Sequence, residues 1–129
     1  MRAGLKGESW ASVSRWEVDR QVPSYSIEAA RHWKALEPKG ELYWILGSDQ
    51  WFTLPRWKNY EELGRLVKFL VFPRPEIAQP LARMKMKSIP LRLDISATDI
   101  RGRLQRGLSV KGLVLPSVEK CLRRSRVYR

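Results

Sequence analysis

The sequence has little of the two residue types that build most metal sites and disulfide frameworks. Its 129 residues include one cysteine, Cys121, and one histidine, His32. One cysteine excludes a disulfide framework and a zinc cluster, and one histidine removes the usual histidine-based metal sets. The scarcity of cysteine also fits a reducing, cytoplasmic setting. We therefore expect no metal ion held by protein side chains.

A long apolar run is also missing. No stretch approaches the roughly 18 continuous apolar residues of a membrane-spanning helix, and residues 1–6 lack the apolar core of a signal peptide. We expect a protein that is neither embedded in a membrane nor exported. Hydrophobic residues make up 43% of the chain and include six Trp, which indicates a packed globular body. The length suits a single domain spanning residues 1–129.

Acidic residues are few in the last third of the chain. The whole sequence has 25 Lys and Arg against 13 Asp and Glu, a net charge of +12. From residue 83 to the end there are thirteen basic residues and three acidic ones. A small ligand that carries phosphate and a polyanion would both use such a surface, so charge alone does not choose between them.

Apolar runs alternate with amphipathic segments along the chain, which favours an α/β fold. The pattern predicts an open, mostly parallel sheet covered by helices on both faces, a Rossmann-like, doubly wound arrangement. Strands are predicted at residues 10–18, 41–46, 68–72 and 91–95. Helices are predicted at 26–36 (N-cap Ser26), 50–54 (ending before Pro55), 60–67 (N-cap Asn59), 96–106 (Gly107 at the C-cap) and 116–125, with a short helix or a loop at 76–87. Residues 2–8 show no helix or strand pattern.

Ligands of such sheets bind beyond the carboxyl ends of the strands. The predicted ends are residues 47–49, 73–75 and 95–96, which we expect along one rim. At the third of these, Ser96 and Asp99 have the spacing of a capping box, so a helix should begin there. Its free N–H groups, with Thr98 and Arg101 in the first turns, would suit a phosphate. The alternative is a capped helix with surface hydroxyls.

Four further residues have a functional interpretation, and three of them also have a structural one. Gly47 can let a ligand approach the backbone closely, and Asp49 can accept from ribose hydroxyls or cap a helix. Trp57 can stack on a heteroaromatic ring or fill the core. Arg74, between two prolines, can contact a nucleotide or lie on an ordinary exposed basic loop.

Taken together, the motifs resemble a known family. From residue 22 to the end, the chain is similar to bacterial nicotinate-nucleotide adenylyltransferases in PSYSIEAAR, ELYWILGSDQWFTLPRW, YEELGRL, FPRP, ISATDIR and GLVLPSVEKCL. The segment ISATDIR resembles the phosphate-binding IS-x-T-x-x-R signature of the nucleotidyltransferase superfamily. The resemblance implies a transferase of NAD biosynthesis that moves AMP from ATP to nicotinate mononucleotide, giving deamido-NAD and pyrophosphate.

The resemblance also implies roles for individual residues. The ATP triphosphate would contact Ser96, Thr98 and Arg101. Adenosine would lie beside Gly47, Asp49 and Arg74. The pyridine ring of nicotinate mononucleotide would stack on Trp57, and its carboxylate would meet the backbone of Tyr25 and Ser26. Mg²⁺ is expected on the triphosphate, held mainly by substrate oxygens and water.

One part of the family pattern is missing. Members of this family begin with a strand and a His-x-Gly-His loop, whereas His32 here lies in a helical pattern and is expected at the surface or half-buried. The chain looks like the later two-thirds of the enzyme, so we assign no catalytic residue and expect little activity from it alone. The strand at 41–46 should then expose an edge and apolar side chains, and the chain should be poorly stable or self-associate.

Two other functions remain open. A nucleotide-binding remnant without catalysis would keep the same residues. A basic nucleic-acid-binding module would use the charge after residue 83, although the sequence has no recognised RNA- or DNA-binding signature.

Overall fold

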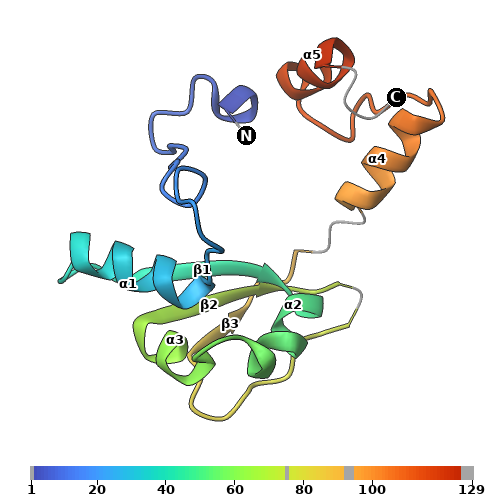
Figure 1. Cartoon of the computed structure of the whole chain (residues 1–129). Helices are drawn as coiled ribbons and strands as arrows, with labels where there is room; N and C mark the ends of the chain where they lie inside the picture. The colour runs from blue at the N-terminus through green and yellow to red at the C-terminus, as the bar shows by residue number, and fades with distance from the viewer. Residues whose placement is uncertain (1, 75, 92–94, 126–129) are drawn as a thin grey trace. The chain divides into compact units, whose positions relative to one another are not determined.

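The computed structural model of the protein describes residues 2–74, 76–91 and 95–125. These fall into two compact units, Trp16–Leu93 and Met1–Arg15 with Asp94–Arg129. Figure 1 shows the elements of both. The expectation that residues 1–129 form a single domain stays a prediction.

The first unit, Trp16–Leu93, is built on a parallel sheet. Its strands are β1 (Leu42–Gly47), β2 (Val67–Phe72) and β3 (Met86–Ser88), in the spatial order β1-β2-β3. Leu42 pairs with Val67 and Gly47 with Phe72, so β1 and β2 end together at the same rim. The predicted strands at 41–46 and 68–72 and their parallel arrangement are confirmed.

Three α-helices accompany this sheet. They are α1 (Ser26–Leu36), α2 (Ser48–Thr53) and α3 (Tyr60–Leu66), and a 3-10 helix, η2 (Leu54–Arg56), follows α2. The prediction that the helix after β1 ends before Pro55 is confirmed, because α2 ends at Thr53. The separate 3-10 turn η2 then runs through Pro55, since a proline at the start of a helical turn loses no hydrogen bond.

Two predicted helix caps differ in the structure. The N-cap of α1 is Tyr25 rather than Ser26, and the Tyr25 N–H donates to Glu28 Oε2 at 3.5 Å. Asn59 is the N-cap of α3, but it adopts a left-handed conformation with φ 52° and its side chain makes no capping bond. Asparagine is one of the residues that tolerate this conformation, which turns the chain into α3.

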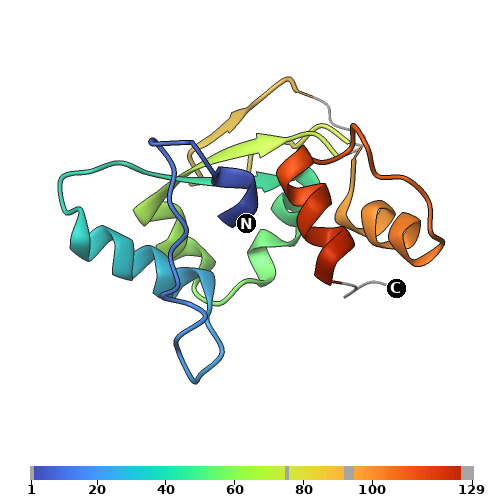
Figure 2. The same cartoon turned by 90° about the horizontal axis from the view of Figure 1, so that it is seen from above.

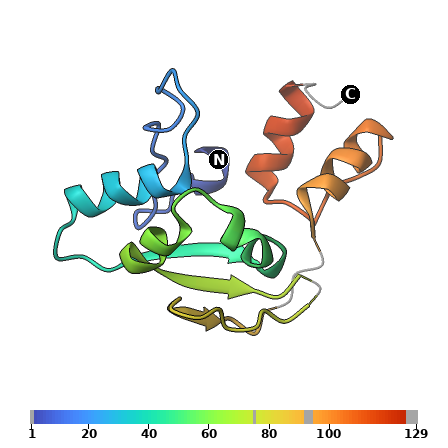
Figure 3. The same cartoon turned by 60° about the horizontal axis from the view of Figure 1, so that its bottom comes forward.

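The core lies between these helices and one face of the sheet. Val67, Phe69 and Val71 of β2 are buried in it, with Ile27 of α1 and Leu63 of α3. The ring of Trp51 meets Phe69 edge to face at 5.3 Å. Figure 3 shows α1, α2 and α3 on the same side of the three strands. This unit therefore folds around a core in which each helix buries one apolar face against alternate residues of β2.

The face of β1 that points away from these helices is exposed, and so is one of its edges. Tyr43 and Ile45 keep 53% and 67% of their accessible surface, and among the described residues β2 is the one strand that pairs with β1. This confirms the expectation that the segment 41–46 presents an edge and apolar side chains. Edges and apolar patches of this kind favour pairing with another chain.

One sequence prediction in this part of the chain is wrong. The described structure has no strand at 10–18; instead Trp16 stacks on His32 with ring centroids 4.4 Å apart, since a strand needs a partner to pair with. Of the two alternatives predicted for 76–87, the loop is the one found at 76–85, because Pro80 interrupts the helical pattern, and β3 follows it. The predicted strand at 91–95 includes residues 92–94, which lie outside the described residues.

The second unit contains η1 (Arg2–Leu5), α4 (Ala97–Gln105) and α5 (Pro116–Ser125). The 3-10 turn η1, which the sequence did not predict, packs against α5 (Figure 2). Gly107 follows α4 with φ +67° and donates to the Leu104 carbonyl, while the Leu108 N–H donates to the Arg103 carbonyl. These are the two bonds of a Schellman motif, so the predicted helix end at Gly107 is confirmed.

None of the described helices is long and apolar enough to cross a membrane.

Candidate nucleotide-binding site

The rim where β1 and β2 end carries three of the predicted site residues. Gly47 is the last residue of β1 and the N-cap of α2, and Asp49 lies exposed in the first turn of that helix. Arg74 follows β2 by two residues and is also exposed. The predicted gathering of residues 47–49 and 73–74 at one rim is therefore confirmed for the described residues.

The close approach around Gly47 brings these residues together. A Cβ atom added to Gly47 would lie 2.3 Å from Asp49 Oδ1 and 3.1 Å from Arg74 Cδ. The φ of Gly47 is −79°, so its backbone does not require glycine. The space it leaves is what allows the carboxylate and the arginine stem to come this close. Because the N-cap is Gly47, the alternative of Asp49 as the cap residue is wrong.

Beside this cluster is a hollow of about 340 Å³. Its wall is mostly apolar, with the Arg74 side chain as its one charged group: it is lined by Ile45, Leu46, Gly47, Phe72, Pro73, Arg74 and Leu91. Apolar walls with a few polar groups are typical of sites for flat ring systems.

The ISATDIR segment belongs to the other unit and forms the start of α4. Ser96 is the N-cap, and its hydroxyl accepts from the Asp99 N–H at 3.0 Å and donates to Asp99 Oδ2 at 2.5 Å. The predicted helix start is thereby confirmed, although the acid meets the Ser96 hydroxyl rather than its backbone. The Arg101 guanidinium donates to Thr98 Oγ1 at 3.2 Å. A hydroxyl and a forked cation thus stand together in the first turns of a helix, where an anion is favoured.

Tyr25, Ser26 and Trp57 lie in the first unit. Lys58, the neighbour of Trp57, sits with its Nζ 4.1 Å from the centroid of the Tyr25 ring, so the start of α1 and the connection after η2 are adjacent. Trp57 is half-buried: it packs against the core, and its Nε1 donates to Thr53 Oγ1 at 3.2 Å. It therefore has the packing of a core residue and still keeps part of its ring exposed.

Sequence reasoning overlooked one residue at the rim. Ser48 has 0% exposure; its hydroxyl accepts from the Arg74 N–H at 2.7 Å and donates to the Arg74 carbonyl at 3.1 Å. Its position directly after a predicted strand end was the available signal. The interpretation of His32 as a half-buried helix residue is confirmed.

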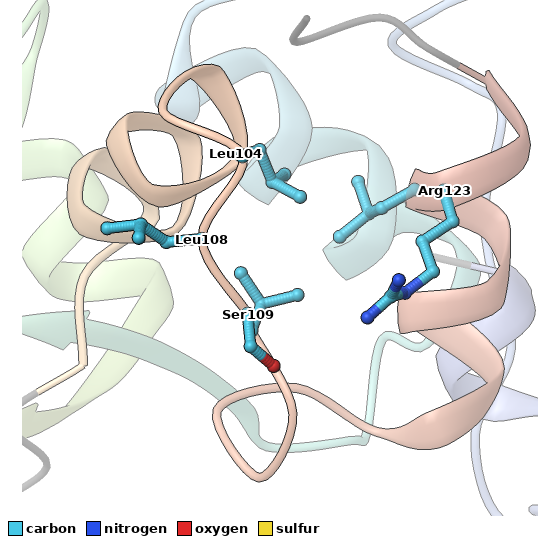
Figure 4. A pocket seen from close by; sticks show the side chains of 7 residues that line it. Leu104, Leu108, Ser109 and Arg123 are labelled. Atoms are coloured by element: carbon cyan, nitrogen blue, oxygen red, sulfur yellow. The ribbon is translucent and has the colours of Figure 1, made fainter.

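Another hollow, of about 170 Å³, lies in the second unit (Figure 4). It is lined by Leu104, Gly107, Leu108, Ser109, Val110, Leu122 and Arg123. The Arg123 side chain, which forms an ion pair with Glu119 at 2.8 Å, is its only charged group. None of the predicted site residues lines this hollow.

The part of the chain that the structure describes contains no group of three or more His, Cys, Asp or Glu side chains that could hold a metal ion. Two of the predicted site segments contain one carboxylate each, Asp49 in α2 and Asp99 in α4. These donors do not form a cage for Mg²⁺, which prefers six oxygen ligands.

A parallel α/β sheet whose strands carry polar residues at their carboxyl ends defines a Rossmann-like fold. Comparison with known families agrees. The cytidylyltransferase-like family matches residues 2–103. The chain belongs to this family, and the match reaches further toward the N-terminus than the resemblance from residue 22 had indicated.

The curated relatives are nicotinate-nucleotide adenylyltransferases. A probable member from Methylacidiphilum infernorum is 39% identical over 118 residues, covering 90% of this chain and 58% of the relative. One from Opitutus terrae is 35% identical over 136 residues, covering 100% of this chain and 69% of the relative. The chain thus spans about three-fifths to two-thirds of the length of these relatives.

Solved structures show the same fold. The nicotinic acid mononucleotide adenylyltransferase of Plasmodium falciparum complexed with APC has a TM-score of 0.69 and 19% identity, over 84% of this chain and 60% of that one. The same protein complexed with NaAD gives a TM-score of 0.67 and 20% identity, over 81% of this chain and 57% of that one. The predicted Rossmann-like α/β fold is confirmed.

Proposed function

We propose that this chain carries the substrate-recognition part of a nicotinate-nucleotide adenylyltransferase, which transfers AMP from ATP to nicotinate mononucleotide and forms deamido-NAD and pyrophosphate. The observation that carries the proposal is the clustering of Gly47, Asp49 and Arg74 at one rim in a chain with close relatives of that name. The setting we propose is the cytoplasm, where the lone Cys121 would stay reduced.

The proposed contacts to ATP fall into two groups, one in each unit. The adenosine would enter the hollow beside Gly47 and Arg74, with Asp49 accepting from the ribose hydroxyls. The triphosphate would meet the start of α4, where Ser96, Thr98 and Arg101 offer hydroxyls and a guanidinium.

Nicotinate mononucleotide would bind beside the start of α1. Its pyridine ring would stack on the exposed part of Trp57, and its carboxylate would meet the backbone of Tyr25 and Ser26. The N–H groups of a helix start favour a carboxylate there. The phosphate of this nucleotide would then attack the α-phosphorus of ATP.

The transfer needs positioning and charge stabilisation more than acid-base chemistry. Residues of this chain would hold the two substrates. Arg101, Thr98 and Ser96 would also hold the departing pyrophosphate. Because no described cluster of side chains forms a cage for it, a Mg²⁺ ion would travel with the triphosphate.

Binding and turnover test the proposal together. We expect the full chain to bind ATP and nicotinate mononucleotide in calorimetric titrations. Arg101→Ala should weaken the affinity for ATP by about 10-fold or more, because it removes a charged hydrogen-bond donor. Arg2→Ala, which removes another exposed arginine, is the matched control. Absence of ATP binding by the unmodified chain would overturn the proposal.

A rate measurement separates the enzyme from a non-catalytic remnant. Pyrophosphate release from the two substrates is compared between this chain and the same chain fused to a preceding segment that contains His-x-Gly-His. Removing a single preorganised donor at a reacting centre typically costs about 100- to 1,000-fold in rate. We expect the fused chain to be faster by at least that order, whereas equal rates at the background level would favour the remnant.

A further inference from the structure

The loop that follows β2 is held at two points by α2. Ser48, at the start of this helix, bonds both backbone groups of Arg74, accepting at 2.7 Å and donating at 3.1 Å. Trp51, one turn later, donates from Nε1 to the Gln79 carbonyl at 2.8 Å. Both side chains are fully buried, with 0% exposure. The three bonds are part-buried, because Ser48 and Trp51 are enclosed while Arg74 and Gln79 lie on the exposed loop.

The chemistry of the Ser48 contact is unusual for a surface loop. Ser48 is the one polar side chain in the buried class among the described residues, and its hydroxyl uses both donor and acceptor on a single residue. Buried polar groups cost free energy unless they are satisfied, so this hydroxyl and the Arg74 backbone depend on each other. Where the strand ladder has ended, the Ser48 side chain supplies the bonds that a neighbouring strand would have made.

The same short helix carries Asp49 on its exposed side. Six residues are too few for a helix that is stable alone, so the contacts of Ser48 and Trp51 also fix α2. The backbone of Arg74 and the carboxylate of Asp49 are thus positioned by one rigid piece of structure. Loss of the Ser48 bonds would loosen the Arg74 backbone at this point and leave Trp51 and the core in place.

From this geometry we infer that Ser48 is a positioning residue. It holds the backbone of Arg74 at the hollow beside Gly47, and Trp51 anchors the far end of the same loop. The effect of Ser48 on ATP binding rests on the proposed function. Ser48 does not touch the ligand in this scheme; it acts through Arg74, which lines the hollow.

The test uses Ser48→Ala in the full chain, with three measurements. Hydrogen exchange of the Arg74 amide should accelerate by about 10-fold, as expected for loss of one part-buried hydrogen bond, while the Phe69 amide in β2 stays protected. The dissociation constant for ATP should rise by about 5- to 10-fold. Affinity for nicotinate mononucleotide should not change, because its proposed site lies at Tyr25 and Trp57.

Two further variants keep the test sharp. Ser88→Ala removes an exposed serine hydroxyl from β3 and should leave all three measurements unchanged. Trp51→Phe removes the bond to the Gln79 carbonyl but keeps an aromatic ring in the core, and should accelerate amide exchange at Gln79 and Leu81 rather than at Arg74.

Unchanged protection of the Arg74 amide in Ser48→Ala would overturn the inference. Equal weakening of both substrates together with a lower melting temperature would also overturn it, since that pattern marks a purely structural residue. Failure of the unmodified chain to bind ATP would reject the proposed function instead, and the exchange measurement would still decide whether Ser48 holds the loop.

Discussion

At the scale of single residues, Trp57 shows how one side chain can serve two purposes. Part of its ring packs against the core and its Nε1 is bound to Thr53, while the residue stays half-buried rather than enclosed. A residue held in this way is preorganised, because it loses little side-chain freedom when a ligand stacks on it.

We predict that Trp57→Ala weakens the binding of nicotinate mononucleotide by about 1–3 kcal/mol, the range for a base stacked on an aromatic ring, and leaves ATP binding nearly intact. Titration of each substrate into the variant measures both effects. Trp10→Ala, at a tryptophan that keeps 80% exposure, is the matched control. A variant that lost ATP affinity and melted early would show that Trp57 is a core residue only.

At the scale of elements, the start of α4 depends on one hydroxyl. Ser96 caps the helix through the Asp99 N–H, and α4 buries only Ile100 among its residues. A helix with so little burial relies on its cap and its hydrogen bonds more than on packing.

We predict that Ser96→Ala lowers stability by about 1 kcal/mol and reduces helical content, because an orphan N–H loses its acceptor. Circular dichroism with urea unfolding measures both. Ser96→Asp restores a capping acceptor and should recover the helix, but its negative charge should still weaken ATP binding. Full recovery of ATP affinity in Ser96→Asp would contradict a phosphate contact at this position.

The pairing of β1 with β2 has a pH-dependent component. Glu41 accepts from Lys68 and from the Tyr43 hydroxyl, and these two hydrogen bonds, that of Lys68 first, hold the pKa of Glu41 below its ordinary value. A folded-state pKa below the unfolded one stabilises the fold above the unfolded pKa, and this contribution is lost as pH falls through the folded pKa.

We therefore predict that Glu41→Gln is less stable than the unmodified chain near neutral pH and that the difference disappears on acidification. Urea unfolding from about pH 7 to about pH 3 measures it. The difference should also shrink in high salt, because both partners are solvent-accessible. A gap that stayed constant across this range would mean that the ion pair does not contribute through the charge of Glu41.

At the scale of the whole molecule, the exposed side of β1 is the feature most open to association. Tyr43 and Ile45 stand on an edge strand whose outer backbone groups face no strand within the described residues. The sequence expectation of self-association follows from such an edge and stays a prediction.

We predict that the chain forms dimers or larger species as its concentration rises, and that Ile45→Lys reduces them, since an edge lysine opposes strand pairing. Sedimentation velocity over a concentration series measures this. Leu36→Lys adds the same charge at another exposed apolar residue and is the control. If both variants had the same effect, net charge rather than the β1 edge would govern association.

The sequence by itself determined the elements whose signals are local. Apolar runs at 41–46 and 68–72, the cap at Ser96 and the glycine at 107 each act over a few residues, so β1, β2 and both ends of α4 could be predicted. The prediction that Gly47, Asp49 and Arg74 would meet followed from the same reasoning, because parallel strands end at one rim.

Tertiary structure decided the rest. Residues 10–18 have the composition of a strand, yet they find no pairing partner in the described structure, and Trp16 stacks on His32 instead. The short strand β3 has almost no sequence signal and exists because it pairs with β2. Ser48 could not be distinguished from any other serine until the loop that carries Arg74 folded over it. Burial and hydrogen bonding between segments far apart in the chain fix these features, and no local pattern records them.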